Sequence, residues 1–286
     1  MTQAENSRAR AGKHKALRLI LGGVLCLAAL AGLGSLLLDR FGVGVHGNPF
    51  RLVGLAEASL KPGCYPEHIP MACQIAGRAW RLQSSGAAWG LTADNDHPGQ
   101  YRFELHEGDM WAKDVRLKKG KGPHGQVERV EFSDLKRQPF GKDFWFGFTL
   151  NVEPGPKTTS DWVNLGQLHN TPDPGEASAS PPWVQGFGPN DSFRIFVRHT
   201  AQNPLVDNPA PIVLFEDHNF QRGRPYRFVY RFRWDPKGNG LAQVWRDDVL
   251  VGNYKGPFGY PDQRGGYFKF GIYRRPAPET MVVHYA

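Results

Sequence analysis

Hydrophobic and polar residues alternate in short runs along most of the chain, which is the pattern of half-buried β-strands. The run YFKFGIYRR at 267–275 shows this alternation most clearly. Three apolar residues share the side that is expected to face a core: Phe268, Phe270 and Ile272. The opposite side holds an unusual set for a solvent face: Tyr267, Lys269 and Tyr273. This second side is therefore a candidate wall of a functional site.

Runs of the same kind recur between turn signals rich in Gly and Pro. They cover 78–83, 100–108, 126–135, 143–152, 161–169, 193–199, 225–234, 242–254, 267–275 and 280–286. The run 242–254 is expected to form a hairpin that turns at Asp247-Asp248. No long segment after residue 38 shows the 3.6-residue period of a helix. So many antiparallel strands predict an all-β fold, a jelly-roll sandwich of the concanavalin type, over residues 76–286.

Two Pro-rich segments, 171–182 and 199–212, interrupt the runs. They are interpreted as loops that either border a groove or simply connect strands at the surface. A separate loop around GKGPHG is rich in basic residues and is either a flap over an anionic polymer or a plain solvated turn. Residues 39–75 are expected to form a linker.

The N-terminal part predicts export. Residues 1–18 carry five basic groups against one acidic group, and 20 uncharged, mostly apolar residues follow from Leu19 to Leu38. That length crosses a bilayer, and basic residues before it keep the N-terminus in the cytoplasm. We favour an uncleaved anchor in the inner membrane of a bacterium over a signal peptide cleaved at the small-x-small site Ala29-Leu30-Ala31. The remaining chain is then periplasmic or extracellular.

Charge and cysteine content narrow the function further. The net charge is +8, and beyond residue 18 the chain has 30 basic and 26 acidic residues, a mild excess that suits an acidic ligand better than nucleic acid. Outside a membrane, Cys64 and Cys73 are expected to form a disulfide that closes a Pro-containing loop. A metal site is the weaker interpretation, since only His68 lies between them. We expect no cofactor; a structural calcium ion has no support in the sequence.

Polar residues on the predicted strands are candidate site residues. Arg231 lies on a basic face of the run 225–234 that either binds carboxylate or sulfate groups or is an ordinary solvated surface. If the run 161–169 is a regular strand, four residues share one side: Val163, Leu165, Gln167 and His169. His169 is either a general base or a histidine bonded to the backbone.

Arg-x-Glu pairs recur on two further strands, at Arg102 with Glu104 and at Arg129 with Glu131. Such pairs either orient a substrate carboxylate or are ion pairs of little consequence. The chain lacks G-x-S-x-G, Walker-type and H-E-x-x-H motifs, which argues against the corresponding hydrolases and nucleotide-binding proteins. It also lacks an E-x-D-x-E run, which weakens glycoside hydrolysis without excluding it.

The order of the motifs carries a family resemblance. R-x-E is followed by FGF, Q-x-H, SPP, VYRFRW, VW with a turn, and K-x-G-I-Y. In this order the chain resembles the jelly-roll polysaccharide lyases that include glucuronan lyase and are related to heparin lyase I. The similarity runs from about Arg78 to about Arg275 and is strongest in GQLHNTPDPGEASASPP and GGYFKFGIYRR. The chain differs from the family at two places: Leu168 stands where an aromatic residue is common, and Asp247-Asp248 stands where Asn-Gly is common in the hairpin turn.

The resemblance implies β-elimination at uronic acids of a polysaccharide. It implies that His169 and Tyr273 share the base and acid roles. It further implies that carboxylates are bound by Lys269, Arg129 and Gln167, with Arg231 and Tyr267 as additional substrate-binding candidates. Elimination needs a neutralised carboxylate, a base for the C5 proton and an acid for O4. Since tyrosine has an ordinary pKa of about 10, we expect nearby Lys269 to lower that of Tyr273, and Gly271 to leave room for a sugar ring.

Two alternatives remain beside a lyase that acts as a monomer on an acidic polysaccharide. A membrane-anchored, non-catalytic glycan-binding module of an exopolysaccharide system would keep the groove and lose the chemistry. A sandwich glycoside hydrolase ranks below both. Nothing in the sequence identifies the polymer.

Overall fold

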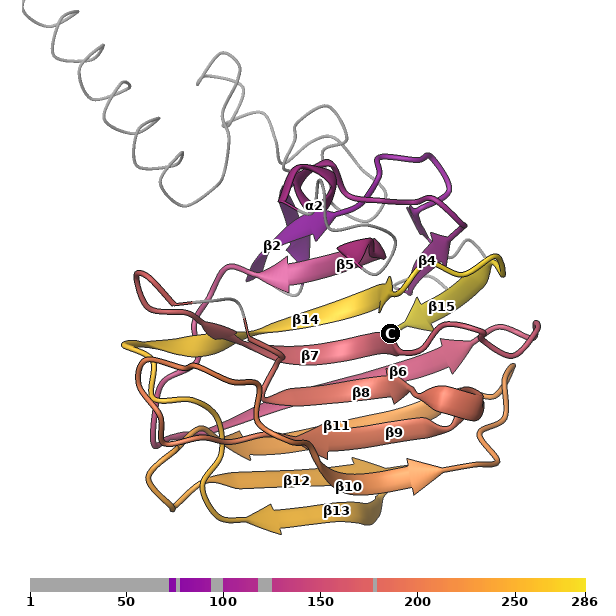
Figure 1. The fold of residues 1–286 in the computed structure, drawn as a ribbon. Helices are drawn as coiled ribbons and strands as arrows, with labels where there is room; N and C mark the ends of the chain where they lie inside the picture. The colour runs from indigo at the N-terminus through magenta and orange to yellow at the C-terminus, as the bar shows by residue number, and fades with distance from the viewer. Residues whose placement is uncertain (1–71, 76–77, 94–99, 118–124, 177–178) are drawn as a thin grey trace, which may run out of the picture. The chain divides into compact units, whose positions relative to one another are not determined.

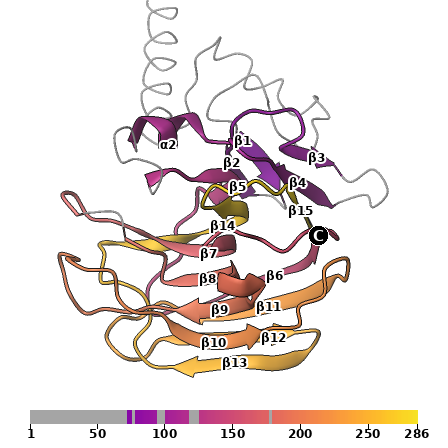
Figure 2. The same cartoon turned by 45° about the vertical axis from the view of Figure 1, so that its right-hand side comes forward.

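The computed structural model describes residues 72–75, 78–93, 100–117, 125–176 and 179–286. Two antiparallel sheets make up nearly all of their regular structure (Figures 1 and 2). Sheet A runs in the order β1 (Ala72–Ile75), β2 (Arg78–Gln83), β5 (Glu128–Asp134), β14 (Arg264–Arg274), β7 (Val163–Thr171), β8 (Trp183–Phe187), β9 (Phe193–Val197) and β10 (Ile212–Asp217). Sheet B runs in the order β13 (Val249–Lys255), β12 (Leu241–Arg246), β11 (Tyr226–Arg233), β6 (Asp143–Val152), β15 (Met281–Tyr285), β4 (Tyr101–Leu105) and β3 (Leu91–Ala93). A short helix, α2 (Ala112–Leu117), and a 3-10 turn, η3 (Pro189–Asp191), lie between strands.

The two sheets pack through their apolar faces, which form one aromatic core. Phe268 of β14 stacks on Phe146 of β6 with ring centres 4.1 Å apart, and Trp183 of β8 packs edge-on against Tyr230 of β11 at 4.7 Å. Offset and edge-on aromatic pairs of this kind add to the energy of area burial. The predicted jelly-roll sandwich is confirmed for these residues. The outer face of sheet A points away from this core and can carry a site.

All ten predicted runs contain strands, and the predicted hairpin joins β12 to β13. Its turn residues Asp247 and Asp248 have φ of +51° and +67°, the left-handed pair that a tight two-residue turn requires. The sequence patterns missed β1, β3, β8 and β10. All five residues of β8 are buried, so it has no polar alternation, and β10 is an exposed edge strand that begins where the Pro-rich segment 199–212 ends.

The expectation that Val163, Leu165, Gln167 and His169 share one side is wrong. The register of β7 against β8 shifts between Asn164 and Gly166, so the strand is not regular. Because a bulge inverts the alternation beyond it, Leu165 and Leu168 both enter the core. Gln167 and His169 are thereby turned to the outer face of sheet A.

Several predictions lie outside the described residues. They are the membrane segment 19–38, Cys64 and the side chain of Cys73, so the anchor, the export and the disulfide stay predictions. None of the helices within the described ranges has the length and apolar character needed to cross a membrane. The strand β1 pairs with β2, so sheet A begins inside the stretch expected to be a linker.

Candidate functional site

A groove of about 540 Å³ lies on the outer face of sheet A. Polar and aromatic residues of its walls come from three strands and the residue after the last of them: Tyr273 of β14, Asn164, Gln167 and His169 of β7, Arg194 and Phe196 of β9, and Arg198 just beyond β9. Between them the small side chains of β8, Val184 and Gly186, form the floor. Both Pro-rich segments border the groove, through 179–181 and through Asn208 and Pro211, and they meet where the Ser180 N–H donates to the Asn208 side-chain oxygen over 2.7 Å.

Strand register explains why these side chains meet. Tyr273 is paired with Asn164, Asn164 with Gly186, and Gly186 with Arg194, so the four form one row across the sheet. Gly186 has φ +156°, and an added Cβ would lie 1.8 Å from the carbonyl oxygen of Val163. Only glycine fits this floor position. Since neighbouring strands lie about 4.8 Å apart, Arg194 stands roughly 14 Å from Tyr273 along the row at the backbone level.

His169 is held as a neutral imidazole. Its Nδ1 lies 2.9 Å from the carbonyl oxygen of Asn170, which can only accept, so Nδ1 carries the proton and Nε2 offers a lone pair. Burial lowers the pKa of His169 to about 3, and the nearby cations of Lys269 and Arg129 act in the same direction. Tyr267 stacks on the imidazole with ring centres 5.4 Å apart. At neutral pH His169 is therefore unprotonated and fixed in orientation.

Tyr273 keeps its proton in the free protein. Trp162 packs edge-on against its ring at 4.9 Å, and the Arg129 guanidinium lies 3.9 Å from the ring centre. Burial raises the pKa of Tyr273 above its ordinary value, and Arg129 offsets only part of that rise. The expectation that a neighbouring cation gives Tyr273 a lowered pKa is wrong, because desolvation outweighs the charge. Tyr273 enters the groove as a proton donor.

Lys269 and Arg129 lie on the same face of sheet A as Tyr273, beside the groove toward β5 and α2, and do not line it. Lys269 is 4% exposed and bound to Glu131, while Arg129 donates to Glu131 over 2.8 Å and pairs with Asp114 over 2.6 Å. Glu131 also accepts a hydrogen bond of 2.8 Å from the Gln167 amide. Two buried cations thus face two buried carboxylates. Their charges are already satisfied, and they support Gln167 through Glu131 and Tyr273 through its ring from the neighbouring strands.

Gly271 serves the backbone and does not make room for a sugar ring as expected. It has φ +131°, and an added Cβ would lie 2.4 Å from the carbonyl oxygen of Val130 on β5. Lys269 and Tyr273 nevertheless keep the predicted common side, with the Lys269 ammonium 5.6 Å from the Tyr273 ring centre.

Two further substrate-binding candidates lie elsewhere. Arg231 is on β11 of sheet B, where it is bound to Asp143, so the structure does not bring it to the groove. Tyr267 is half-buried between His169 and Arg137, whose guanidinium lies 4.1 Å from its ring. It supports His169 instead of lining the groove.

Sequence reasoning missed the cations that do line the groove. Arg198 is tied to the rim, donating to the carbonyl oxygens of Pro209 and Pro181 over 3.1 Å each. Arg194 makes no hydrogen bond or ion pair with any residue that the structure describes. The alternation in FRIFVRH contained the signal, because it puts both arginines opposite the core-facing residues of β9.

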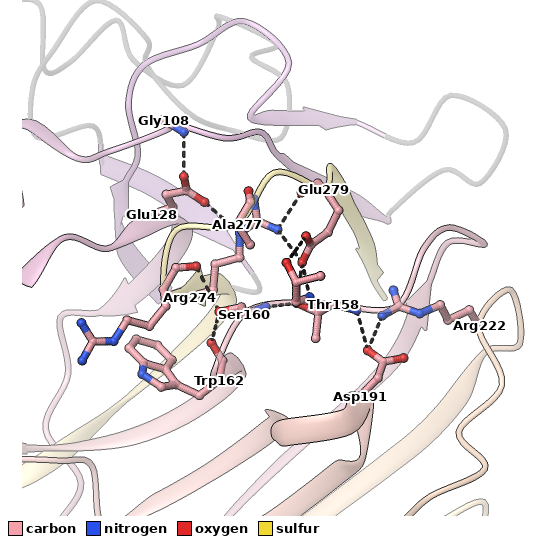
Figure 3. Close-up of polar contacts among 12 residues, drawn as sticks. Gly108, Glu128, Thr158, Ser160, Trp162, Asp191, Arg222, Arg274, Ala277 and Glu279 are labelled. Carbon is pink, nitrogen blue, oxygen red and sulfur yellow. Dashed lines mark hydrogen bonds and ion pairs between the residues drawn. The ribbon is translucent and has the colours of Figure 1, made fainter. Parts of the chain in front are cut away.

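A buried polar network fixes the end of the groove beside Trp162 (Figure 3). Arg274 is fully buried, donates to Glu128 over 2.9 Å and holds the carbonyl oxygens of Ala277 and Glu279. The Glu279 carboxylate in turn accepts a hydrogen bond of 2.7 Å from Thr158. The Ser160 hydroxyl donates to the carbonyl oxygen of Trp162 over 2.8 Å. The network thereby holds Trp162 against Tyr273.

Comparison with known proteins gives a family. Residues 92–286 match the family model described as polysaccharide lyase. No curated protein matches the chain. Similar solved structures include alginate lyase AlyC3, at 12% identity over 68% of this chain and 75% of that one with a TM-score of 0.48. Endo-β-1,4-glucuronan lyase from the fungus Trichoderma reesei has 13% identity over 80% and 89%, with a TM-score of 0.43. Alginate lyase PA1167 from Pseudomonas aeruginosa has 17% identity over 72% and 94%, with a TM-score of 0.46.

Proposed function

The chain belongs to the polysaccharide lyase family, as its motif order predicted, and on this premise we propose that it cleaves a uronic-acid-containing polysaccharide by β-elimination. One observation carries the proposal: an unprotonated His169 and a protonated Tyr273 line the same groove, together with cations. A base and an acid in opposite protonation states are what a concerted elimination requires.

The two groups take complementary roles in the step. Nε2 of His169 accepts the proton from C5 of the uronate, and the electrons of that C–H bond form the C4–C5 double bond. The C4–O4 bond breaks, its electrons stay on O4, and the Tyr273 hydroxyl donates a proton to O4. The products are a chain with a new hydroxyl end and a chain with an unsaturated uronate end. Proton exchange with water then restores both side chains.

Neutralisation of the substrate carboxylate falls to groups that line the groove. Asn164 and Gln167 supply amides next to Tyr273 and His169. Arg194, which has no hydrogen-bond or ion-pair partner among the described residues, supplies a guanidinium on the opposite wall. A carboxylate bound near His169 also raises the pKa of its imidazole, which makes proton acceptance easier than in the free protein. Arg198 contributes positive charge while it holds both Pro-rich rims.

The test is the appearance of the ultraviolet absorbance of an unsaturated uronate during incubation with alginate, glucuronan or a heparin-like polymer. We expect absorbance to grow with at least one acidic polymer and with no neutral glucan. Tyr254→Phe is the matched control, because that hydroxyl lies on β13 and donates to Pro257 away from the groove. Binding of an acidic polymer without any absorbance would contradict the lyase proposal and leave a glycan-binding module.

A further inference from the structure

A second surface with binding chemistry lies on the outer face of sheet B, on the other side of the sandwich from the groove. Trp145 of β6 is 55% exposed, and Trp245 of β12 stacks beside it with ring centres 5.7 Å apart and planes 22° apart. We propose that this surface, the tryptophan face, is a second binding site for an acidic polysaccharide. The identification of the ligand as an acidic polysaccharide rests on the proposed function. The arrangement of residues on the face is observed independently of it.

The tryptophan face is built by strand register. Trp145 is paired with Arg231 of β11, and Arg231 with Gln243 of β12, in one row across the sheet. Trp245 is paired with Val229, so the two indoles reach toward each other diagonally across β11. Together they form a flat apolar platform outside the hydrophobic core. Large exposed aromatic groups that pack on each other at a surface mark an interaction site.

Positive charge adjoins the platform. The Arg231 guanidinium lies 5.6 Å from the Trp145 ring centre, and Arg231 and Arg233 share the single carboxylate of Asp143. A depression of about 500 Å³ opens next to them and is lined by Arg231, Arg233, Gln243 and Lys255. Lys255 forms no ion pair with the part of the chain that the structure describes. Against these three cations stand the carboxylate of Asp143 and that of Asp235, which acts on Arg233, so the face keeps a surplus of one positive charge for an anionic ligand.

A polysaccharide with carboxylates fits both features. Sugar rings have apolar C–H faces that pack on aromatic rings, while their carboxylates bind guanidinium groups in a planar, two-point geometry. A chain that lies over the indoles can place a carboxylate in the adjoining depression. Such a site would keep a polymer on the enzyme between cleavage events in the groove. This role explains the arginine stripe of β11, which has no part in the groove.

The experiment uses the full chain with Tyr273→Phe, so that polymer is not degraded, and measures mobility in gels that contain alginate, glucuronan or a neutral glucan. Trp145→Ala should weaken binding of the acidic polymer by about tenfold, the scale of one stacked aromatic group. Arg233→Gln with Lys255→Gln should weaken it several-fold and reduce its dependence on salt. Arg227→Gln is the matched control, since Arg227 shares the strand and the face but lies outside the depression and pairs with Asp248.

In the active protein, Trp145→Ala should lower the rate on dilute polymer and leave the rate on short oligosaccharides unchanged. Equal polymer binding by Trp145→Ala and its parent would overturn the proposal, as would the absence of binding to every acidic polymer. Self-association that Trp145→Ala abolishes, with polymer binding intact, would also overturn it and assign the face to a second copy. Failure of the lyase proposal is distinguished by the absorbance assay, in which no unsaturated ends would form.

Discussion

Glu131 is the position where a single substitution tests the buried charge network beside the groove. It is 1% exposed and accepts bonds from Arg129, Lys269 and Gln167. Glu131→Gln leaves two buried cations with the Asp114 carboxylate alone. Removal of one partner of a buried ion pair costs about 3–5 kcal/mol of unfolding free energy. Lys269 can lessen this cost by losing its proton, because burial lowers its pKa to about 8.

We therefore expect Glu131→Gln to lower the unfolding free energy by about 3 kcal/mol at pH 7 in urea titrations. The loss should be smaller at pH 9, where Lys269 is largely neutral before the substitution. The double variant Glu131→Leu with Lys269→Met should be more stable than the single one, since replacing both partners of a buried pair by apolar groups is often tolerated. Asp248→Asn, which breaks an exposed pair with Arg227, is the control and should change stability by less than about 1 kcal/mol.

A loss below about 1 kcal/mol for Glu131→Gln would refute the reasoning, because Glu131 would then not be compensating buried charge. A double variant that loses the sum of the two single effects would refute it equally. That result would mean that Glu131 and Lys269 stabilise the fold independently.

Three further predictions concern the groove and its supports. Arg194→Gln should raise KM for an acidic polymer about tenfold, because Arg194 is expected to bind a substrate carboxylate. The melting temperature should not change, because Arg194 has no partner among the described residues. An unchanged KM would show that Arg194 does not bind substrate. Asp262 is a buried carboxyl near Asn170, the residue whose carbonyl oxygen holds His169. Burial, with Glu176 nearby, raises the pKa of Asp262 to about 7, so the unfolding free energy should fall as the pH rises from about 4 to about 7 and then level off. Asp262→Asn should flatten that dependence, and a parallel shift of the whole curve would count against the assignment. Arg274→Ala should destabilise by about 3–5 kcal/mol in thermal or urea unfolding, since it leaves Glu128 buried and unpaired, and a loss under about 1 kcal/mol would contradict the role of this network.

Much of the fold could be predicted from the sequence because the core-facing side of each strand is nearly uniform. The aromatic alternation of β11 and β14 identified two central strands of the sandwich. β8 could not be found in this way, because it is buried on both faces and its outer side carries only Val184 and Gly186. Alternation reveals a strand only where one face meets water.

The sequence predicted which residues belong to the candidate site more accurately than it predicted how they are arranged. His169, Gln167 and Tyr273 do meet in one groove, although β7 reaches that arrangement through a bulge that no spacing rule indicated. Lys269 and Arg129 were expected to bind substrate carboxylates because they match positions in the motifs of the resembled family. Their burial and the pairing of Lys269 with Glu131 are tertiary facts, since these two residues lie on different strands. The pair of Arg129 with Glu131 lies within β5 and follows the Arg-x-Glu spacing.

The most direct test of the account is the initial rate of unsaturated-uronate formation by Tyr273→Phe, measured with polymer binding on the same preparation. Loss of the donated proton should lower the rate by at least about 100-fold, the scale of general acid catalysis, while binding changes little. Tyr254→Phe should keep the rate of the parent. A Tyr273→Phe protein that turns over at the parental rate would contradict the assignment of Tyr273 as the acid and, with it, the proposed chemistry of the groove.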